Sequence, residues 1–264
     1  MTSIRVVVHG ALSKVGQEVV KAVYREPEMK LAGAVDRKAT QDSLALPDGS
    51  GTVPYSADLE SILSSCRPDV IVDFTIAKAA MLAVRIAAKS GVNMVIGTTG
   101  LTADDLGEIE RLTVENKIGV VVAPNFALGA VLMVHLAGIA ARYLDYAEII
   151  ELHHNQKADA PSGTAKSTAK AMAAERGKPF LRSAEQDGAF TSRGEQFEGI
   201  NIHSVRLPGL LAHQEVILGA PGQTLSIRHD TISRECFMPG VILAIKEVVK
   251  RKGFTYGLDT LLGL

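Results

Sequence analysis

The stretch Ile4-Arg-Val-Val-Val-His-Gly-Ala-Leu-Ser-Lys-Val-Gly16 decides the fold of this chain. Its first part, Ile4–Val8, is an apolar, β-branched run typical of a buried strand. A helical pattern over Val15–Tyr24 follows, with its valines on one face. The turn between them brings backbone N–H groups and a helix N-terminus together, an arrangement that binds a pyrophosphate. Only two glycines of the usual three are present, with Ser13 at the middle position, so an ordinary strand-to-helix turn remains an alternative.

The alternation of strand and helix continues through the first half of the chain. Apolar runs predict strands at Leu31–Val35, Val70–Phe74, Met94–Ile96 and Val120–Ala123, with helices at Ala77–Ser90 and Ala103–Glu115. Residues 50–65 are less regular and predict a loop followed by a short helix from Asp58. Alternating elements with nearly continuous apolar strands predict an α/β fold, a Rossmann-like parallel sheet covered on both faces.

The pattern changes after about Leu128. A long helix to about Tyr143, a strand at 147–154, a helix from Ser162 to about Arg176 and strand-like runs at Ile200–Leu207, Gln214–Gly219 and Thr224–Arg228 follow. Gly222-Gln223 predicts a hairpin turn, and a last helix at Val241–Lys252 is expected to return to the first domain. We expect residues 1–127 plus 240–264 to form the dinucleotide-binding domain. Residues 128–239 are expected to form an inserted α+β domain for substrate binding and tetramerisation.

Composition excludes several classes of function. The chain has 264 residues and a net charge of −1, so no overall field attracts nucleic acid or a membrane surface. No apolar run reaches the roughly 20 residues of a membrane span, and the strand pattern at the N-terminus leaves no room for a signal peptide. The two cysteines are far apart and have no metal-ligand spacing. We expect a cytoplasmic protein without metal, membrane or nucleic-acid binding.

Asp36 supports the dinucleotide interpretation. It ends the second expected strand, 20 residues after Gly16, where an acid accepts hydrogen bonds from the adenine ribose hydroxyls. Arg37 and Lys38 follow directly, and they either pair with a 2′-phosphate or belong to a solvated loop. Two further strand ends, Gly97-Thr-Thr-Gly100 and Ala123-Pro-Asn-Phe126, carry small residues at the sheet edge where ligands of open α/β sheets bind.

Titratable groups crowd the run from Glu148 to Lys157, which contains His153 and His154. An isolated histidine is more often a hydrogen-bonded or surface residue, and Lys157 alone would be read as a surface lysine. Consecutive strand side chains point to opposite faces, so the two histidines are expected to have different tasks unless the strand has ended. A lysine beside the reacting atom can act as a general acid.

A helix start follows this run at Ser162-Gly-Thr164, after Pro161. Ser162 is expected to cap the helix, which is a sufficient structural reason for a serine there. Capping leaves neighbouring N–H groups free for a bound carboxylate, so both interpretations hold together.

The run Glu151-Leu-His-His-Asn-Gln-Lys-Ala-Asp-Ala-Pro-Ser-Gly-Thr-Ala165 resembles the signature of the 4-hydroxy-tetrahydrodipicolinate reductase (dihydrodipicolinate reductase) family of bacterial lysine and diaminopimelate synthesis. The resemblance extends over the whole chain, because further stretches match the family pattern in order. These are Val72-Asp-Phe-Thr75, Val95-Ile-Gly-Thr-Thr-Gly100, Pro124-Asn-Phe126, His203-Ser-Val-Arg-Leu-Pro-Gly209 and Ser233-Arg234 with Phe237.

The resemblance implies reduction of a cyclic dicarboxylate by hydride transfer from NADH and/or NADPH, in a homotetramer assembled through the second domain's sheet. It implies that His153 is the catalytic acid/base and Lys157 the proton donor. Substrate contacts are implied for His154, Ser162, Gly163 and Thr164. Cofactor contacts are implied for Gly10, Ala11, Leu12, Ser13, Lys14, Val15, Asp36, Arg37, Gly97, Thr98, Thr99, Ala123, Pro124, Asn125 and Phe126.

Two positions depart from the family pattern. Ser13 stands where glycine is usual, and Ile76 stands where a polar or charged residue is common. Both bear on cofactor affinity and preference rather than on the reaction. Two rival functions remain: a related imine reductase on the same scaffold, and a non-catalytic dinucleotide sensor that binds cofactor without turnover.

Overall fold

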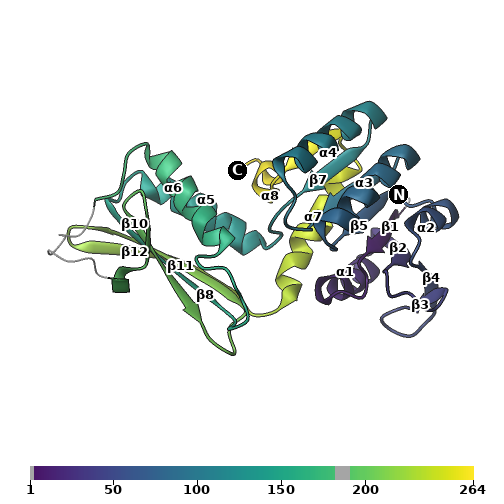
Figure 1. Ribbon diagram of the computed structural model, residues 1–264, viewed down its shortest axis with the longest axis horizontal. Helices are drawn as coiled ribbons and strands as arrows, with labels where there is room; N and C mark the ends of the chain where they lie inside the picture. Colours follow the sequence, from purple (N-terminus) through teal and green to yellow (C-terminus); the bar gives the residue numbers. More distant parts are fainter. Residues whose placement is uncertain (1–2, 182–190) are drawn as a thin grey trace. The chain divides into compact units, whose positions relative to one another are not determined.

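The computed structural model describes residues 3–181 and 191–264. The chain divides into two compact units, shown in Figure 1. The first is made of Met1–Leu128 with Arg234–Leu264, and the second of Gly129–Ser233. The C-terminal segment therefore returns to the unit that the N-terminal segment begins.

The first unit is built on an eight-stranded sheet in the order β13-β7-β6-β5-β1-β2-β4-β3. All neighbours are parallel except β3 and β4, which are antiparallel. The five strands that the sequence predicted are present, which confirms the parallel α/β sheet. The strands are β1 (Ile4–His9), β2 (Met29–Val35), β3 (Ser43–Ala45), β4 (Thr52–Ser56), β5 (Val70–Asp73), β6 (Asn93–Ile96), β7 (Gly119–Val122) and β13 (Gly253–Tyr256).

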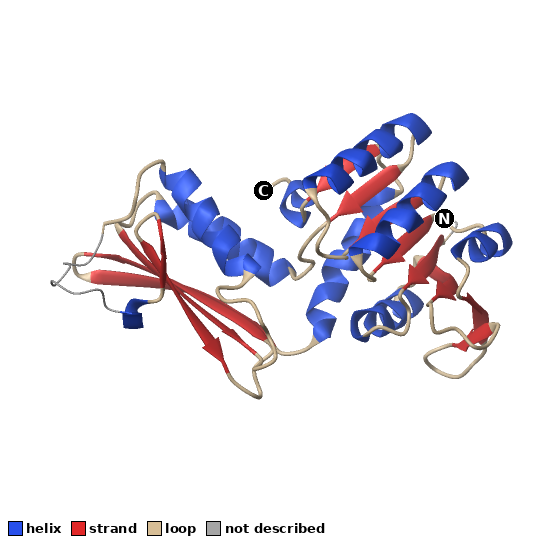
Figure 2. Ribbon diagram, viewed as in Figure 1, coloured by secondary structure: helices blue, strands red, loops and turns tan. Residues whose placement is uncertain are grey.

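Helices cover both faces of this sheet (Figure 2). Helices α2, α3 and α4 pack in a row, and α1 packs with α7. Buried side chains of the strands, such as Val7 and Ile71, form one core cluster with α2, α3 and α4. The helices are α1 (Lys14–Arg25), α2 (Leu59–Cys66), α3 (Ala77–Ser90), α4 (Ala103–Asn116), α7 (Met238–Val248) and α8 (Leu258–Leu262), with a 3₁₀ turn η2 at Arg234–Phe237.

Local chemistry explains where these helices begin. Asp58 caps α2 by accepting a hydrogen bond from the Glu60 N–H at 3.0 Å. Thr102 and Asp105 form a reciprocal capping box at the start of α4, and such a cap is worth about 1 kcal/mol. The short helix predicted from Asp58 is thereby confirmed.

Three strands of this unit, β3, β4 and β13, are absent from the prediction. Thr52–Ser56 was expected to be a loop, but it forms β4, which pairs with the end of β2. The expected last helix, Val241–Lys252, is too long at its C-terminus, because α7 ends at Val248 and β13 follows. β13 pairs in parallel with β7 and extends the sheet at that edge.

The second unit contains a five-stranded mixed sheet in the order β12-β11-β8-β10-β9. β8 is parallel to β10 and antiparallel to β11, and β11 is antiparallel to β12. The predicted hairpin is present, but its two-residue loop is Pro221-Gly222, because Ala220 pairs with Gln223. The strands are β8 (Tyr146–His153), β9 (Glu195–Phe197), β10 (Ile200–Arg206), β11 (Ala212–Ala220) and β12 (Gln223–Thr231), preceded by a 3₁₀ turn η1 at Thr191–Arg193.

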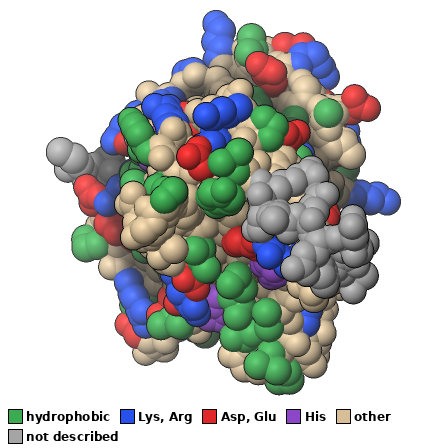
Figure 3. Space-filling view, turned by 90° about the vertical axis from the view of Figure 1, so that its left-hand side faces the viewer, with side chains coloured by type: hydrophobic (Ala, Val, Ile, Leu, Met, Phe, Trp, Pro, Cys, Tyr) green, Lys and Arg blue, Asp and Glu red, His purple; other side chains and the backbone are tan. Residues whose placement is uncertain are grey.

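The two long helices of this unit, α5 (Leu128–Ala141) and α6 (Gly163–Arg176), lie on one side of the sheet (Figure 2). They bury a second core that includes Ile149 of β8 and Val216 of β11. Figure 3 looks onto the second unit, where hydrophobic side chains lie among charged and histidine side chains. Within the described ranges, no helix is long and apolar enough to cross a membrane.

Candidate active site

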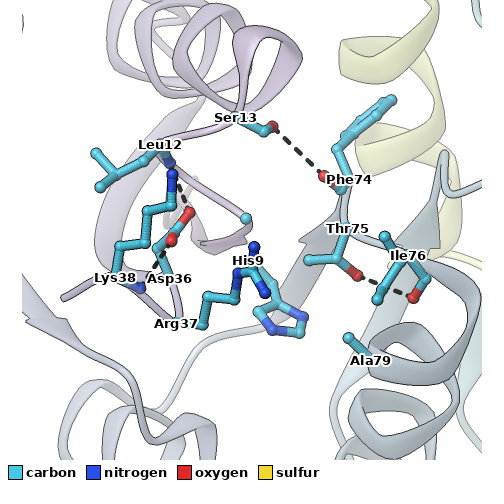
Figure 4. Close-up of a pocket in the computed structure, with 11 residues that line it drawn as sticks. His9, Leu12, Ser13, Asp36, Arg37, Lys38, Phe74, Thr75, Ile76 and Ala79 are labelled. Atoms are coloured by element: carbon cyan, nitrogen blue, oxygen red, sulfur yellow. Dashed lines mark hydrogen bonds between the residues drawn. The ribbon is translucent and has the colours of Figure 1, made fainter.

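A pocket of about 330 Å³ lies at the carboxyl ends of β1, β2 and β5 in the first unit. β1 has β2 on one side and β5 on the other, so the order of the strands reverses at this point. Ligands of open α/β sheets bind at such a switch point. The lining residues are His9, Gly10, Leu12, Ser13, Asp36, Arg37, Lys38, Phe74, Thr75, Ile76 and Ala79 (Figure 4).

The two glycines of the first turn are required by close backbone contacts. Gly10 has φ +83°, and a Cβ atom there would lie 2.8 Å from the Phe74 carbonyl oxygen. A Cβ atom on Gly16 would lie 2.0 Å from the Gly10 carbonyl oxygen. Ser13, by contrast, has φ −66° and caps α1, its hydroxyl accepting from the Gly16 N–H at 2.9 Å. The turn therefore forms without a glycine at the middle position.

Asp36 is held in place at the edge of the pocket, with 8% of its surface exposed. One carboxylate oxygen accepts from the Leu12 N–H and the other from the Lys38 N–H, each at 3.0 Å. Burial raises the pKa of the nearby Tyr55 hydroxyl, and the charge of Asp36 raises it further. Because each oxygen of a carboxylate has two lone pairs, Asp36 retains acceptor capacity for a ribose hydroxyl.

The walls of the pocket differ in character. Figure 4 shows Asp36, Arg37 and Lys38 on one side, Thr75, Ile76 and Ala79 on the other, and His9 between them. Arg37 and Lys38 are exposed, which fits both a contact with a 2′-phosphate and a solvated loop.

A hydrogen bond holds the His9 ring in place, because its Nδ1 lies 2.6 Å from the fully buried carboxylate of Asp73. Asp73 also accepts from the Thr75 hydroxyl at 3.0 Å and from the Thr98 hydroxyl at 2.5 Å. Thr98, which was predicted to contact cofactor, thus uses its hydroxyl within the protein.

The pocket contains five of the predicted cofactor residues: Gly10, Leu12, Ser13, Asp36 and Arg37. The remaining ten do not line it: Ala11, Lys14, Val15, Gly97, Thr98, Thr99, Ala123, Pro124, Asn125 and Phe126. Their cofactor contacts stay predictions. The sequence reasoning gave no role to His9, Phe74, Thr75 and Ala79, all of which line the pocket. Thr75 and Phe74 directly follow the end of β5, the same signal that had identified the other strand ends.

A second cluster lies in the second unit, around the buried Glu151 of β8. His153 Nδ1 lies 2.5 Å from one carboxylate oxygen of Glu151. Arg206 of β10 binds both oxygens, at 2.8 and 2.7 Å, and the Ser162 N–H donates to Glu151 at 3.1 Å. Glu151 is 0% exposed, so its charge depends on these donors.

Burial works to raise the pKa of Glu151, but hydrogen bonds from His153, Arg206 and Ser204 outweigh it and lower the pKa to about 2. The ion pair in turn raises the pKa of Arg206. Glu151 is therefore a carboxylate at neutral pH. A carboxylate only accepts hydrogen bonds, so Nδ1 of His153 carries a hydrogen. Nε2 is then the ring nitrogen that can gain or lose a proton.

Lys157 follows this cluster in a turn in which its N–H donates to the His154 carbonyl at 3.1 Å. β8 ends at His153, so His154 belongs to the turn rather than to the strand. Lys157 Nζ lies 2.7 Å from Asp159 Oδ1, and this hydrogen bond is the main cause that lowers the pKa of Asp159. Arg206 also donates to the Asp159 carbonyl at 2.7 Å, which links the turn to the Glu151 cluster.

The helix start at Ser162 fits its predicted structural role. The Ser162 hydroxyl accepts from the Ala165 N–H at 3.1 Å, and Ser162 itself is 2% exposed. Its N–H donates to Glu151, so Ser162 holds the Glu151 carboxylate and the helix start together from a buried position. Gly163 is exposed with open space where a Cβ would lie, and the N–H groups of Gly163 and Thr164 have no partner in the described part of the chain. Unpaired N–H groups at a helix start are suited to binding an anion, and the substrate contacts of Gly163 and Thr164 stay predictions.

Glu151 and Arg206 were not assigned a role from the sequence. A usable signal was present, because Glu151 continues the alternating buried register of Ala147 and Ile149 on β8. A charged residue in that register requires a buried partner. Among the described residues, no group of three or more His, Cys, Asp or Glu side chains could hold a metal ion.

Two family models match the chain: "Dihydrodipicolinate reductase, N-terminus" over residues 4–126 and "Dihydrodipicolinate reductase, C-terminus" over residues 129–262. A 4-hydroxy-tetrahydrodipicolinate reductase of Dehalococcoides mccartyi is 60% identical over the whole of both chains. One from Moorella thermoacetica is 48% identical over 99% of both chains.

A solved structure of dipicolinate-bound dihydrodipicolinate reductase from Paenisporosarcina sp. TG-14 matches with a TM-score of 0.85 and 41% identity, over 98% of this chain and 99% of that chain. An amine dehydrogenase from Mycobacterium smegmatis shares the fold, with a TM-score of 0.66 at 16% identity over 98% of this chain and 96% of that chain. With both halves matched by the family's models and the whole length matched by its curated members, this chain belongs to the dihydrodipicolinate reductase family.

Proposed function

We propose that this chain reduces 4-hydroxy-tetrahydrodipicolinate to tetrahydrodipicolinate with NADH or NADPH, in the diaminopimelate and lysine biosynthesis pathway. The observation that carries the proposal is the family match over both units, joined to the cluster of Glu151, His153 and Arg206 beside the start of α6. The cofactor supplies the hydride when bound, and the side chains align the reactants and move protons.

The first unit fits a dinucleotide. Gly10 and Gly16 keep the turn free of side chains where the chain packs most closely, and α1 presents its N-terminus there. Asp36 can accept from a ribose hydroxyl, and Arg37 and Lys38 can meet a 2′-phosphate. Gly10, Ala11, Leu12, Ser13, Lys14 and Val15 are the residues proposed to surround the pyrophosphate.

The second unit fits a dicarboxylate. The free N–H groups of Gly163 and Thr164 suit one carboxylate of the substrate, and His154 is proposed as a further contact. These interactions are present before and during the reaction, so they contribute mainly to substrate affinity.

Proton movement is assigned to His153 and Lys157. Reduction removes water from the hydroxyl-bearing carbon of the substrate ring and adds a hydride there, after which the ring takes up one proton. We propose that Lys157, assisted by His153, donates that proton. In the structure Lys157 is paired with Asp159, so a substrate carboxylate would compete with Asp159 for the ammonium group.

The decisive experiment measures cofactor oxidation with substrate formed in situ from pyruvate and aspartate semialdehyde. Turnover of both NADH and NADPH is expected. Tight binding of cofactor without turnover would favour the dinucleotide sensor. Turnover only with other cyclic imines would favour a related imine reductase.

The quaternary structure and location complete the proposal. We propose a homotetramer assembled through the sheet of the second unit, acting in the cytoplasm. The face of that sheet opposite to α5 and α6 carries apolar side chains such as Ile150 and Ile217 and supports the assembly.

A further inference from the structure

We propose that Glu151 is a positioning residue for proton delivery, which holds the His153 imidazole with Nδ1 protonated and Nε2 available for exchange. The inference rests on the proposed function, because it assumes that His153 takes part in moving the proton. Glu151 itself touches neither substrate nor cofactor in this assignment. It acts through the ring of His153.

The surroundings of Glu151 argue against a role in packing alone. Its side chain occupies the helix-facing register of β8, where Ala147 and Ile149 are buried and apolar. A buried ion pair contributes little net stability compared with apolar side chains of similar volume, because both charges lose their hydration. Apolar side chains in place of both Glu151 and Arg206 would be about as stable, so stability alone does not account for the carboxylate.

Both carboxylate oxygens of Glu151 accept hydrogen bonds from fixed directions, and the Ser204 side chain is a further donor. Oε2 accepts from His153 Nδ1 at 2.5 Å and from Arg206 Nη1 at 2.8 Å. Oε1 accepts from Arg206 Nη2 at 2.7 Å and from the Ser162 N–H at 3.1 Å. Arg206 thereby fixes the plane of the carboxylate, and that plane fixes the ring of His153.

The same carboxylate holds the start of α6. Ser162 binds Glu151 through its N–H and caps the helix through its hydroxyl. The next two N–H groups, of Gly163 and Thr164, are those proposed to bind substrate. Glu151 thus sets the position of the proton-carrying imidazole relative to the substrate-binding helix start.

Replacement of Glu151 by glutamine tests this directly. Glutamine is nearly isosteric but offers one acceptor oxygen and one donor NH₂ group. Arg206 donates to both oxygens, whereas the Ser162 N–H donates to Oε1 alone. Ser162 therefore favours the amide oxygen at the Oε1 position, which turns the NH₂ group toward His153 Nδ1. The imidazole must then accept at Nδ1, and its hydrogen moves to Nε2.

Glu151→Gln is expected to lower kcat at least about 10-fold and at most as far as His153→Ala, which we place in the 10²–10⁴-fold range of general acid–base catalysis. KM should change less than 3-fold, on the order of ordinary surface effects. The solvent deuterium isotope effect on kcat should increase, while the isotope effect from cofactor deuterated at the transferred position should decrease. A purely structural lesion would slow both steps together.

A double variant and an NMR measurement complete the test. Glu151→Gln with His153→Ala should be little slower than His153→Ala alone, because residues that act as one unit are not additive. Independently of turnover, ¹⁵N shifts of the His153 ring should report the Nδ1–H tautomer in the parent and Nε2–H in Glu151→Gln.

Glu148→Gln is the matched control. Glu148 lies three residues earlier on β8, is bonded to His203 at 2.5 Å and to Asn201 at 2.8 Å, and takes no part in the proposed chemistry. It should keep kcat within 3-fold, on the order of ordinary surface substitutions. If Glu151→Gln fails to fold because Arg206 loses its partner, Glu151→Asp retains the charge but withdraws it from His153, and the same loss of kcat is expected.

The outcomes separate the two proposals. No turnover by the parent protein would sink the proposed function. Normal parental turnover, with kcat retained in folded Glu151→Gln or with fully additive losses in the double variant, would overturn the role of Glu151 alone.

Discussion

Gly97, at the end of β6, lies against the ring of Phe74, so a Cβ atom at position 97 would come within 2.1 Å of that ring. Phe74 is one of the residues that line the pocket, and its ring packs at 5.7 Å, centroid to centroid, on Phe126. The sequence had suggested that Gly97 leaves room for a ligand. The structure shows that the absent side chain leaves room for the Phe74 ring, and the cofactor contact of Gly97 stays a prediction.

Gly97→Ala should therefore displace Phe74 and disturb the pocket. We expect the free energy of unfolding to fall by about 1–3 kcal/mol, as for other overpacked cores, and the Kd for NADH to rise. Thermal denaturation and fluorescence titration measure the two effects. Gly107→Ala is the control, because Gly107 is an exposed helical residue with open space around a Cβ, and it should be neutral or stabilising.

Replacing Arg37 and Lys38 together with alanine should weaken NADPH binding more than NADH binding. The two side chains lie beside Asp36 at the pocket, where their charge can meet a 2′-phosphate that NADH lacks. Calorimetric titration with both cofactors measures the ratio. Equal losses for the two cofactors would show that the side chains do not reach the 2′-position.

Lys157→Ala and His153→Ala should each lower kcat about 10²–10⁴-fold while leaving cofactor affinity unchanged. His154→Ala should instead raise KM, because its proposed contact is made in the ground state and the transition state alike. Lys166→Ala is a matched control on α6, with a side chain that is 48% exposed. Near-normal kcat in a correctly folded Lys157→Ala variant would remove the proton-donor assignment.

Acid should destabilise the second unit through Glu151. Its pKa is lowered from 4.5 to about 2 in the folded state, so the carboxylate stabilises the fold fully above the unfolded-state value of 4.5. That stabilisation is lost as pH falls from about 4.5 to about 2. The difference corresponds to about 3 kcal/mol of unfolding free energy.

Urea unfolding at a series of pH values between 7 and 2 checks this expectation. Glu151→Gln should be less stable at pH 7 and should show a smaller decline in the free energy of unfolding below pH 4.5. Identical pH profiles for the two proteins would contradict the assignment.

Light scattering at micromolar concentration should give a homotetramer, and Ile217→Lys should reduce the assembly. Ile217 is half-buried on β11, and its side chain points away from the core residues Val216 and Leu218. A charged residue there would have to be desolvated in an interface between sheets. A monomeric parent protein would contradict the proposed assembly.

Much of the first unit was predictable because its signals are local. The valines of α1 at Val19, Val20 and Val23 are all buried, as a one-sided helical pattern requires. β4 was missed because Pro54 argues against a strand. It is tolerated near the sheet edge, where β4 pairs with β2 only at Tyr55 and Ser56. β13 is as short as β5, β6 and β7, but those strands are buried, largely apolar runs, whereas Gly253-Phe-Thr-Tyr256 mixes polar residues with apolar ones and is only partly buried.

Only the site residues that stand close together in the sequence could be predicted to lie close together in the structure. His153, Lys157 and Ser162 stand in one continuous run, so their proximity follows from the sequence. Arg206 comes from β10, and its contact with Glu151 depends on the parallel register that pairs Arg206 with His153. Such a register arises from the assembled sheet and has no signature in a single sequence.

The return of the C-terminal segment to the first unit has a consequence for biosynthesis. Strand β13 and helix α7 complete a sheet whose other strands are made before residues 129–233. The intervening Gly129–Ser233 segment takes roughly 5–20 s to synthesise at about 5–20 residues per second. During that interval β7 has an unpaired edge on the ribosome, and an exposed edge strand is a site for pairing with another nascent chain. We expect the growing chain to depend on chaperone protection until Arg234–Leu264 emerges, a demand that a protein with sequential domains would not make.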